Sequence, residues 1–152
     1  ILRRLKFDND TIRKVTKLVY YHDYRMPAKT KNVRRAMYKM GEELFPLYLE
    51  VMLADILAQS EYQRDEKLDN IEAIRRCYEE ILEKNQCVSL KTLAVKGNDL
   101  IALGMKPGKE IGETLHMLLE MVIEDPTLNK KEVLEEKVKK NVRCGEQQLD
   151  KA

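Results

Sequence analysis

Apolar residues recur three or four positions apart through most of the chain, which is the spacing of one face of an α-helix. A first helix is predicted behind the capping candidates Asp8, Asn9 and Asp10, and a loop should follow it from residue 23. Its inward stripe is formed by Ile12, Val15, Leu18, Val19 and His22. A second helix, beginning near residue 30, divides into an apolar side and a basic side. The apolar side holds Val33, Ala36, Met37 and Met40, and the basic side holds Lys31, Arg34, Arg35 and Lys39.

The stretch from Leu47 to Gln59 is almost entirely apolar, so it should form the most buried helix of the chain. Ser60 and Gln63 then have the spacing of a capping box, which predicts the start of a long helix that ends near residue 84.

Glycine residues are concentrated in the second half of the chain. Four of the six lie within sixteen residues and predict tight turns, namely Gly97, Gly104, Gly108 and Gly112. Asn98 or Asp99 can cap a short helix that ends at Leu103, where Gly104 should take the left-handed conformation at the helix C-terminus. A longer helix should start at Pro107. Asn129 can cap a last, charged helix that ends near residue 142.

No stretch of the sequence predicts a strand that we trust. We therefore expect an all-α, bundle-like array of about seven to nine helices. The first domain should cover residues 1–86 and a segment with glycine-rich turns residues 87–142, with a frayed tail over residues 143–152.

Composition narrows the class of protein. With 43% hydrophobic and 36% charged residues, the chain should fold, and no apolar run reaches the roughly 18 residues of a membrane span. A secretory signal pattern is also missing from the sequence. Cys77, Cys87 and Cys144 are an odd number of cysteines without metal-ligand spacing. Reduced thiols in a cytoplasmic protein that does not enter a membrane are the expectation.

Charge is divided unevenly along the chain. Residues 1–40 contain twelve Lys and Arg against three Asp, a net charge of +9, and the other 112 residues have sixteen basic and twenty-three acidic residues, a net of −7. Such asymmetry indicates an anionic partner: nucleic acid, an acidic membrane, or the acidic half of the chain. The candidates for phosphate contacts are Arg3, Arg4, Arg13, Lys14, Lys17, Arg34, Arg35 and Lys39. A merely solvated basic face is the alternative.

Two further constellations could bind ligands. The turn from Gly104 to Gly108, with Lys106 and Lys109, could seat a phosphate at a helix start, or it could simply join two packed helices. His22 and Asp55 have side chains that suit a metal ion. Alternatively, His22 is a hydrogen-bonded core residue and Asp55 forms a narrow polar edge with Gln59.

Two strings in the second half identify a family resemblance, Leu93–Gly104 and Lys106–Gly112. They resemble the corresponding region of bacterial tRNA nucleotidyltransferases, the CCA-adding and poly(A) polymerase-like enzymes. Upstream, Leu18–Asp23 and Ala54–Gln59 resemble the latter part of the HD domain that many of these enzymes contain. The resemblance runs from about residue 1 to residue 134.

The resemblance implies a role in tRNA processing. In this family the nucleotide is transferred in an N-terminal head, whose Gly-Ser loop and Asp-x-Asp pair bind two metal ions. No Gly-Ser loop with such a pair is found in this chain, and it begins at Ile1 rather than Met. The expectation is an inactive C-terminal fragment with no catalytic residue and no cofactor. It would hold tRNA, while Mg²⁺ with CTP or ATP acts in the missing head.

Motif matching makes Asp55 the last metal ligand of an HD domain and His22 a late histidine, but the earlier ligands are missing. Two isolated ligands do not complete a metal site. Two alternative functions stay open. One is an HD-type metal-dependent phosphohydrolase centred on His22 and Asp55, and the other is a scaffold or dimerisation module that self-associates.

Overall fold

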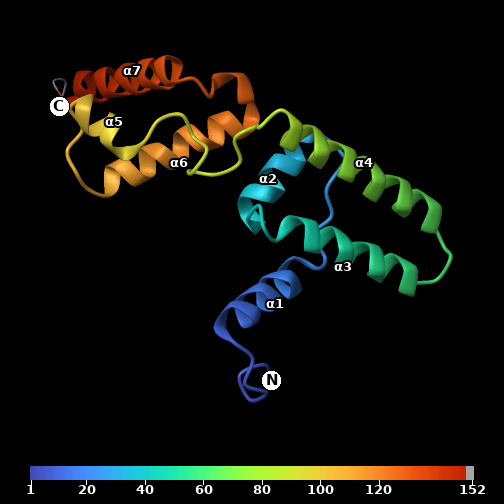
Figure 1. Ribbon diagram of the computed structural model, residues 1–152. Coiled ribbons are helices and arrows are strands. Elements are labelled where there is room, and N and C mark those ends of the chain that lie inside the picture. Colours follow the sequence, from blue (N-terminus) through green and yellow to red (C-terminus); the bar gives the residue numbers. More distant parts are fainter. Residues whose placement is uncertain (150–152) are drawn as a thin grey trace. The chain divides into compact units, whose positions relative to one another are not determined.

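The computed structural model describes the backbone of residues 1–149 and the side chains of residues 1–140 (Figure 1). Over this range the chain forms seven α-helices and one 3₁₀-helix, and no strand is present among the described residues. The predicted all-α fold is thus confirmed. The helix α7 is described as far as Leu149, and residues 150–152 of the predicted tail lie outside the described residues.

The chain forms two compact units. The N-terminal unit is Ile1–Asn85, and the C-terminal unit begins at Gln86. The assignment of the first unit to an HD-like domain stays a prediction.

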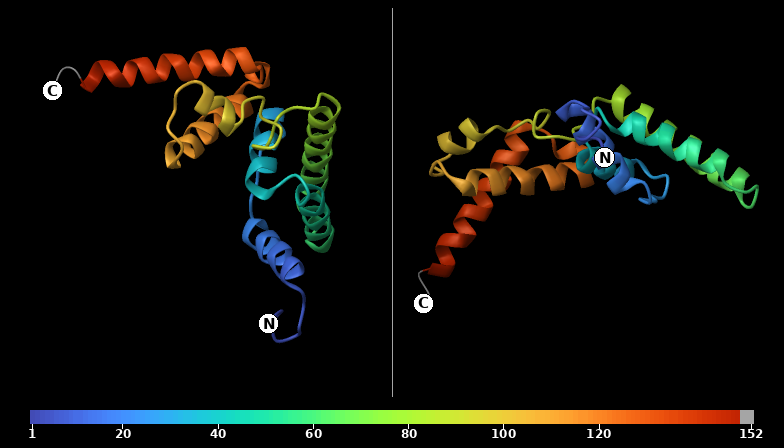
Figure 2. Two further views of the ribbon diagram at one scale, coloured as in Figure 1. Left: turned by 60° about the vertical axis from the view of Figure 1, so that its left-hand side comes forward. Right: turned by 90° about the horizontal axis from the view of Figure 1, so that it is seen from below.

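The N-terminal unit contains four helices: α1 (Asn9–Tyr21), α2 (Thr30–Met40), α3 (Phe45–Ala58) and α4 (Arg64–Glu83). The helix α4 packs against both α2 and α3, and it runs alongside α3 (Figure 1 and Figure 2). The largest side chains in this core include Met37, Met40, Phe45, Tyr48, Ile74 and Ile81. Their burial against three helices supplies the main hydrophobic stabilisation of the unit.

The first helix differs from its prediction in one respect. Asp8 caps it as expected, since its carboxylate accepts a hydrogen bond from the Thr11 amide at 2.9 Å. However, no residue of α1 is buried, and Val19 of the predicted inward stripe is exposed. Helical periodicity reveals an apolar face, but it does not show how far neighbouring helices cover that face.

The prediction that α3 is the most deeply buried helix is wrong. One face, including Phe45 and Tyr48, lies in the core, whereas Leu47 is 46% exposed and Leu57 is 56% exposed. The neighbouring helices α2 and α4 therefore leave much of its apolar surface uncovered.

The start of α4 also differs from its prediction. The helix begins at Arg64, and the residue before it, Gln63, makes no side-chain cap and has a positive φ of 52°. The predicted Ser60–Gln63 capping box is therefore wrong. Asp65 and Glu66 lie in the first turn instead, where negative charge interacts favourably with the helix dipole.

The C-terminal unit contains α5 (Gly97–Ala102), α6 (Lys109–Glu124), the 3₁₀-helix η1 (Pro126–Leu128) and α7 (Lys131–Leu149). Helix α6 packs against α5 and η1. The core of this unit includes Leu93, Leu100, Leu118, Leu119, Ile123 and Leu134. Gly104 ends the α5 segment with a φ of 97°, which confirms the predicted left-handed glycine there.

The two predicted caps of this unit differ in outcome. Asp99 does help to cap α5, but from inside the helix, because its carboxylate accepts a hydrogen bond from the amide of the N-cap residue Lys96 at 2.7 Å, as in a capping box. The Asn129 side chain accepts from the Ala94 amide at 2.8 Å and donates to the Thr92 carbonyl at 3.1 Å. Asn129 thus fastens the segment before α5 to the segment before α7. Cys77 and Cys87 are free thiols, and the side chain of Cys144 lies outside the described residues.

Candidate nucleic-acid interface

His22 lies at the C-terminal end of α1 and does not face the core. Its Nδ1 atom is 2.7 Å from the Val19 carbonyl oxygen, and its Nε2 atom is 2.9 Å from a carboxylate oxygen of Asp23. The ring is exposed, so the expectation that it continues the inward stripe of α1 is wrong. No residue of α1 is buried, so the stripe that His22 was expected to continue does not itself face a core.

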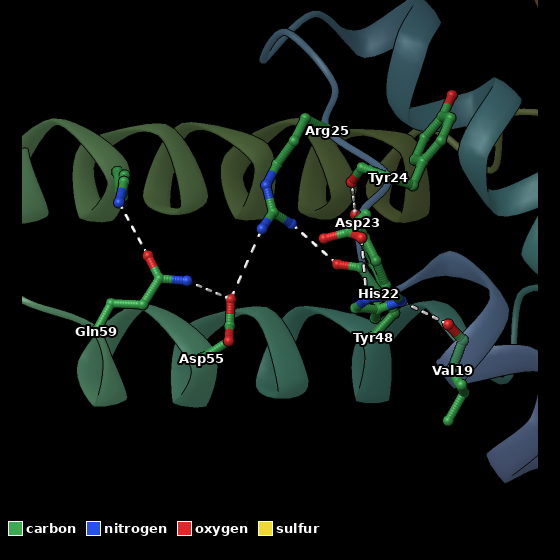
Figure 3. A network of polar contacts seen from close by, with 9 residues as sticks. Val19, His22, Asp23, Tyr24, Arg25, Tyr48, Asp55 and Gln59 are labelled. Carbon is green, nitrogen blue, oxygen red and sulfur yellow. Dashed lines mark hydrogen bonds and ion pairs between the residues drawn. The ribbon is translucent and has the colours of Figure 1, made fainter.

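Asp55 belongs to a line of polar contacts that crosses the N-terminal unit (Figure 3). It pairs with Arg25 at 3.6 Å and accepts a hydrogen bond from the Gln59 side chain at 2.7 Å. Gln59 in turn accepts from the Lys67 ammonium at 2.9 Å. The geometry agrees with a polar edge of α3 formed by Asp55 and Gln59, and it ties α3 to α4.

The structure does not bring His22 and Asp55 together as metal ligands. The guanidinium of Arg25 links them, since it pairs with Asp55 and donates to the His22 carbonyl at 3.0 Å. Among the residues that the structure describes, no group of three His, Cys, Asp or Glu side chains could hold a metal ion. The described residues therefore do not fit the metal site that the resemblance implies.

The exposed side of α1 carries a basic hollow with a volume of about 590 Å³. We name it the basic hollow, and it is lined by Arg3, Asn9, Ile12, Arg13, Thr16, Lys17, Tyr20 and Tyr21. Three of the predicted phosphate-binding side chains, Arg3, Arg13 and Lys17, thus line one surface. Arg4 is also exposed, but it does not line this hollow.

An acidic residue of α1 itself, Asp10, partly neutralises this surface. Asp10 pairs with Lys14 at 2.7 Å and with Arg13 at 2.6 Å. These two cations hold the pKa of the Asp10 carboxyl below its ordinary value, and the same pairs raise the pKa of Lys14 and of Arg13. Asp8 and Asp10 do have an Asp-x-Asp spacing, but their carboxylates serve as a helix cap and as a partner for these cations.

A second hollow adjoins the first and is aromatic. The tyrosine hollow, as we name it, has a volume of about 510 Å³ and is lined by Tyr20, Tyr21, Tyr24 and Lys39. The Lys39 ammonium lies 5.7 Å from the centre of the Tyr24 ring. The sequence analysis did not select these tyrosines, although their clustering just after three basic residues of α1 was a usable signal.

The basic side of α2 is less uniform than its sequence predicts. Lys39 is exposed and Arg35 is half-buried, but Arg34 is only 5% exposed. Lys84 is the main cause of the lowered pKa of Glu80, and the nearby charge of Arg34 adds to it. The predicted clean division of α2 into an apolar and a basic face is therefore wrong at Arg34, which does not join the exposed surface.

The glycine turn of the C-terminal unit keeps both of its predicted interpretations. Lys106 and Lys109 are exposed, and Lys109 pairs with Glu113 at 3.1 Å along α6. A phosphate seat and a simple turn are both compatible with this arrangement.

The fold and the two hollows define an all-α module with an exposed surface of cations and tyrosines. None of the helices in the described part of the chain is long and apolar enough to cross a membrane. The chain belongs to the family described as "tRNA nucleotidyltransferase domain 2 putative", whose model matches residues 1–138. This match confirms the resemblance to tRNA nucleotidyltransferases. No curated protein and no solved structure matches the chain.

Proposed function

We propose that this chain is the tRNA-holding module of a cytoplasmic tRNA nucleotidyltransferase. The observation that carries the proposal is the grouping of Arg3, Arg13, Lys17 and Lys39 around two adjoining hollows in a chain of this family. Cations of this kind neutralise backbone phosphates and give affinity without reading the base sequence. The module would position the tRNA so that its 3′ end reaches the site of nucleotide addition.

The chemical step belongs, in this proposal, to a catalytic head outside the described residues. That head would add nucleotides from CTP or ATP to the tRNA 3′ hydroxyl with Mg²⁺, and this chain would contribute no catalytic residue.

A charge-reversal experiment tests the tRNA-binding surface. The triple variant Arg3→Glu, Lys17→Glu and Lys39→Glu changes three cations that are spread over both hollows, of which Arg3 and Lys39 are exposed and Lys17 is half-buried. Each lost phosphate contact reduces the salt slope by about 0.7 to 0.9, so we expect much weaker tRNA binding and a slope shallower by about 2 to 3. Fluorescence anisotropy of labelled tRNA measures both quantities.

A matched control separates this surface from net charge. Lys91, Lys130 and Lys139 are exposed cations of the C-terminal unit that line neither hollow. Their triple change to Glu alters the net charge by the same amount and should cost much less affinity. Equal losses in the two triple variants would disprove the assignment of the surface.

Two alternatives are not adopted. A metal-dependent phosphohydrolase centred on His22 and Asp55 finds no support in the described contacts, because Arg25 links the two residues. Self-association of the chain stays a prediction, and sedimentation at two salt concentrations tests it.

A further inference from the structure

Tyr20 is the most exposed of the three tyrosines around the tyrosine hollow. It lies in the last turn of α1 and is 79% exposed, although aromatic side chains usually bury much of their surface. Tyr20 and Tyr21 line both hollows, so their rings border the aromatic surface on one side and the cationic surface of α1 on the other.

The three tyrosine rings do not stack on one another. Tyr20 and Tyr21 meet at 4.9 Å between ring centres with an angle of 89°, and Tyr21 and Tyr24 meet at 6.0 Å with an angle of 85°. An edge-to-face contact covers one face of one ring, so these two contacts cover at most two of the six ring faces. With its high exposure, Tyr20 therefore presents aromatic surface to solvent.

The position of Tyr24 is fixed from the core side. The buried Tyr48 hydroxyl donates a hydrogen bond to the Tyr24 carbonyl, and the Tyr24 ring points away from the Arg25–Asp55 contact (Figure 3). On the outer side, Lys39 places its ammonium 5.7 Å from the centre of this ring. These two contacts tie Tyr24, in the loop between α1 and α2, to α3 through Tyr48 and to α2 through Lys39.

The chemistry of the lining selects a class of ligand. In the described part of the chain, no acidic side chain lines either hollow, and Asp10 lies beside the basic hollow paired with Arg13, so the two linings favour an anionic over a cationic ligand. Aromatic faces beside Lys and Arg are the combination that binds unpaired nucleotides, with the base stacked and the phosphate paired. Each hollow also lies within the roughly 300 to 1,000 Å³ of small-ligand sites. Bases inside a duplex are already stacked and cannot offer their faces.

We propose that the tyrosine hollow is a subsite for one unpaired nucleotide of the bound RNA. The base stacks on Tyr20 at the edge of the hollow, and Lys17 and Lys39 hold the flanking phosphates. This inference rests on the proposed function, and it adds a preference for single-stranded over double-stranded RNA that a purely cationic surface would not have.

The test compares two RNA probes on the whole chain. One is a single-stranded oligoribonucleotide, and the other is a blunt RNA duplex of the same length. Loss of one stacked base weakens binding by about tenfold, so Tyr20→Ala should lower the single-strand affinity by that factor and leave the salt slope unchanged. Binding of the duplex should change by less than about twofold, because no base in it can stack on Tyr20.

Two control variants show whether the effect comes from the aromatic ring of Tyr20. Tyr20→Phe retains the ring and should bind the single strand almost as the unchanged chain does. Tyr62 is 74% exposed in the connection between α3 and α4, away from both hollows, and Tyr62→Ala should have no effect. Since both positions are exposed, circular dichroism should show an unchanged fold.

The outcomes separate this inference from the proposed function. Equal losses on both probes, or no loss in Tyr20→Ala while the triple charge reversal still abolishes binding, would overturn the stacking subsite alone. No binding of tRNA or of either probe by the unchanged chain would overturn the proposed function and this inference together.

Discussion

Arg25 forms an ion pair with Asp55, with 3.6 Å between its guanidinium nitrogen and the carboxylate oxygen. The contact joins the segment after α1 to the last turns of α3. Both side chains are about half exposed, so the pair is a surface contact in water. Its presence gives Asp55 a partner other than a metal ion.

Replacing Asp55 should therefore have a small effect on stability. Exposed ion pairs contribute at most about 1 kcal/mol, so Asp55→Asn should lower the free energy of unfolding by no more than that. Urea denaturation followed by circular dichroism measures the change. A loss above about 3 kcal/mol would be the value for a buried or metal-linked carboxylate and would contradict this account.

The Tyr48 hydroxyl makes the stability of the N-terminal unit depend on alkaline pH. Burial raises the pKa of Tyr48 from 10.0 to about 12. Because the folded-state pKa is the higher one, this stabilisation is complete below pH 10.0 and is lost as the pH rises through about 12. Urea denaturation at a series of pH values between these limits should show a falling midpoint.

The variant Tyr48→Phe isolates this hydroxyl. It removes the donor to the Tyr24 carbonyl and should cost about 1 to 2 kcal/mol at neutral pH, while most of the alkaline loss disappears. Tyr62→Phe, at an exposed position, is the matched control and should change neither quantity. An unaltered pH dependence in Tyr48→Phe would assign the alkaline loss to another group.

Asp10 should weaken the affinity of the chain for RNA. It pairs with Arg13 and Lys14, so Asp10→Asn releases two cations beside the basic hollow. We expect tighter tRNA binding and a salt slope steeper by up to about 2, measured by anisotropy. Asp65→Asn, in the first turn of α4, makes the same charge change away from the hollows and serves as the control. An equal gain in both variants would mean that net charge alone is responsible.

Asn129 should be a main polar determinant of stability in the C-terminal unit. Asn129→Ala removes a bond to the Ala94 amide and one to the Thr92 carbonyl. Leaving such groups without a partner costs about 1 to 3 kcal/mol, which thermal or urea unfolding would detect. Asn98→Ala, at an exposed position in α5, should cost much less. Comparable losses would show that the Asn129 bonds contribute little.

Local signals in the sequence predicted local structure well. Asp8 as a helix cap and Gly104 as a left-handed residue depend on their immediate neighbours, and the structure confirms both. The Ser60–Gln63 box failed because the same spacing can occur in a turn that precedes the helix.

Features that depend on packing could not be predicted from periodicity. The burial of Arg34 and the exposure of Leu57 are decided by which helices pack against α2 and α3. Charge asymmetry pointed to the N-terminal cations, but it could not show that Lys39 lies beside Tyr24. That contact joins two segments fifteen residues apart, and only the fold brings them together.

The central claim is that this chain holds tRNA through the cations around its two hollows. Anisotropy of labelled tRNA with the unchanged chain, from about 50 to about 250 mM salt, tests it most directly. The account predicts binding that weakens steeply as the salt concentration rises. Absence of binding even at the lowest salt concentration would contradict it and would assign the basic residues to packing or assembly.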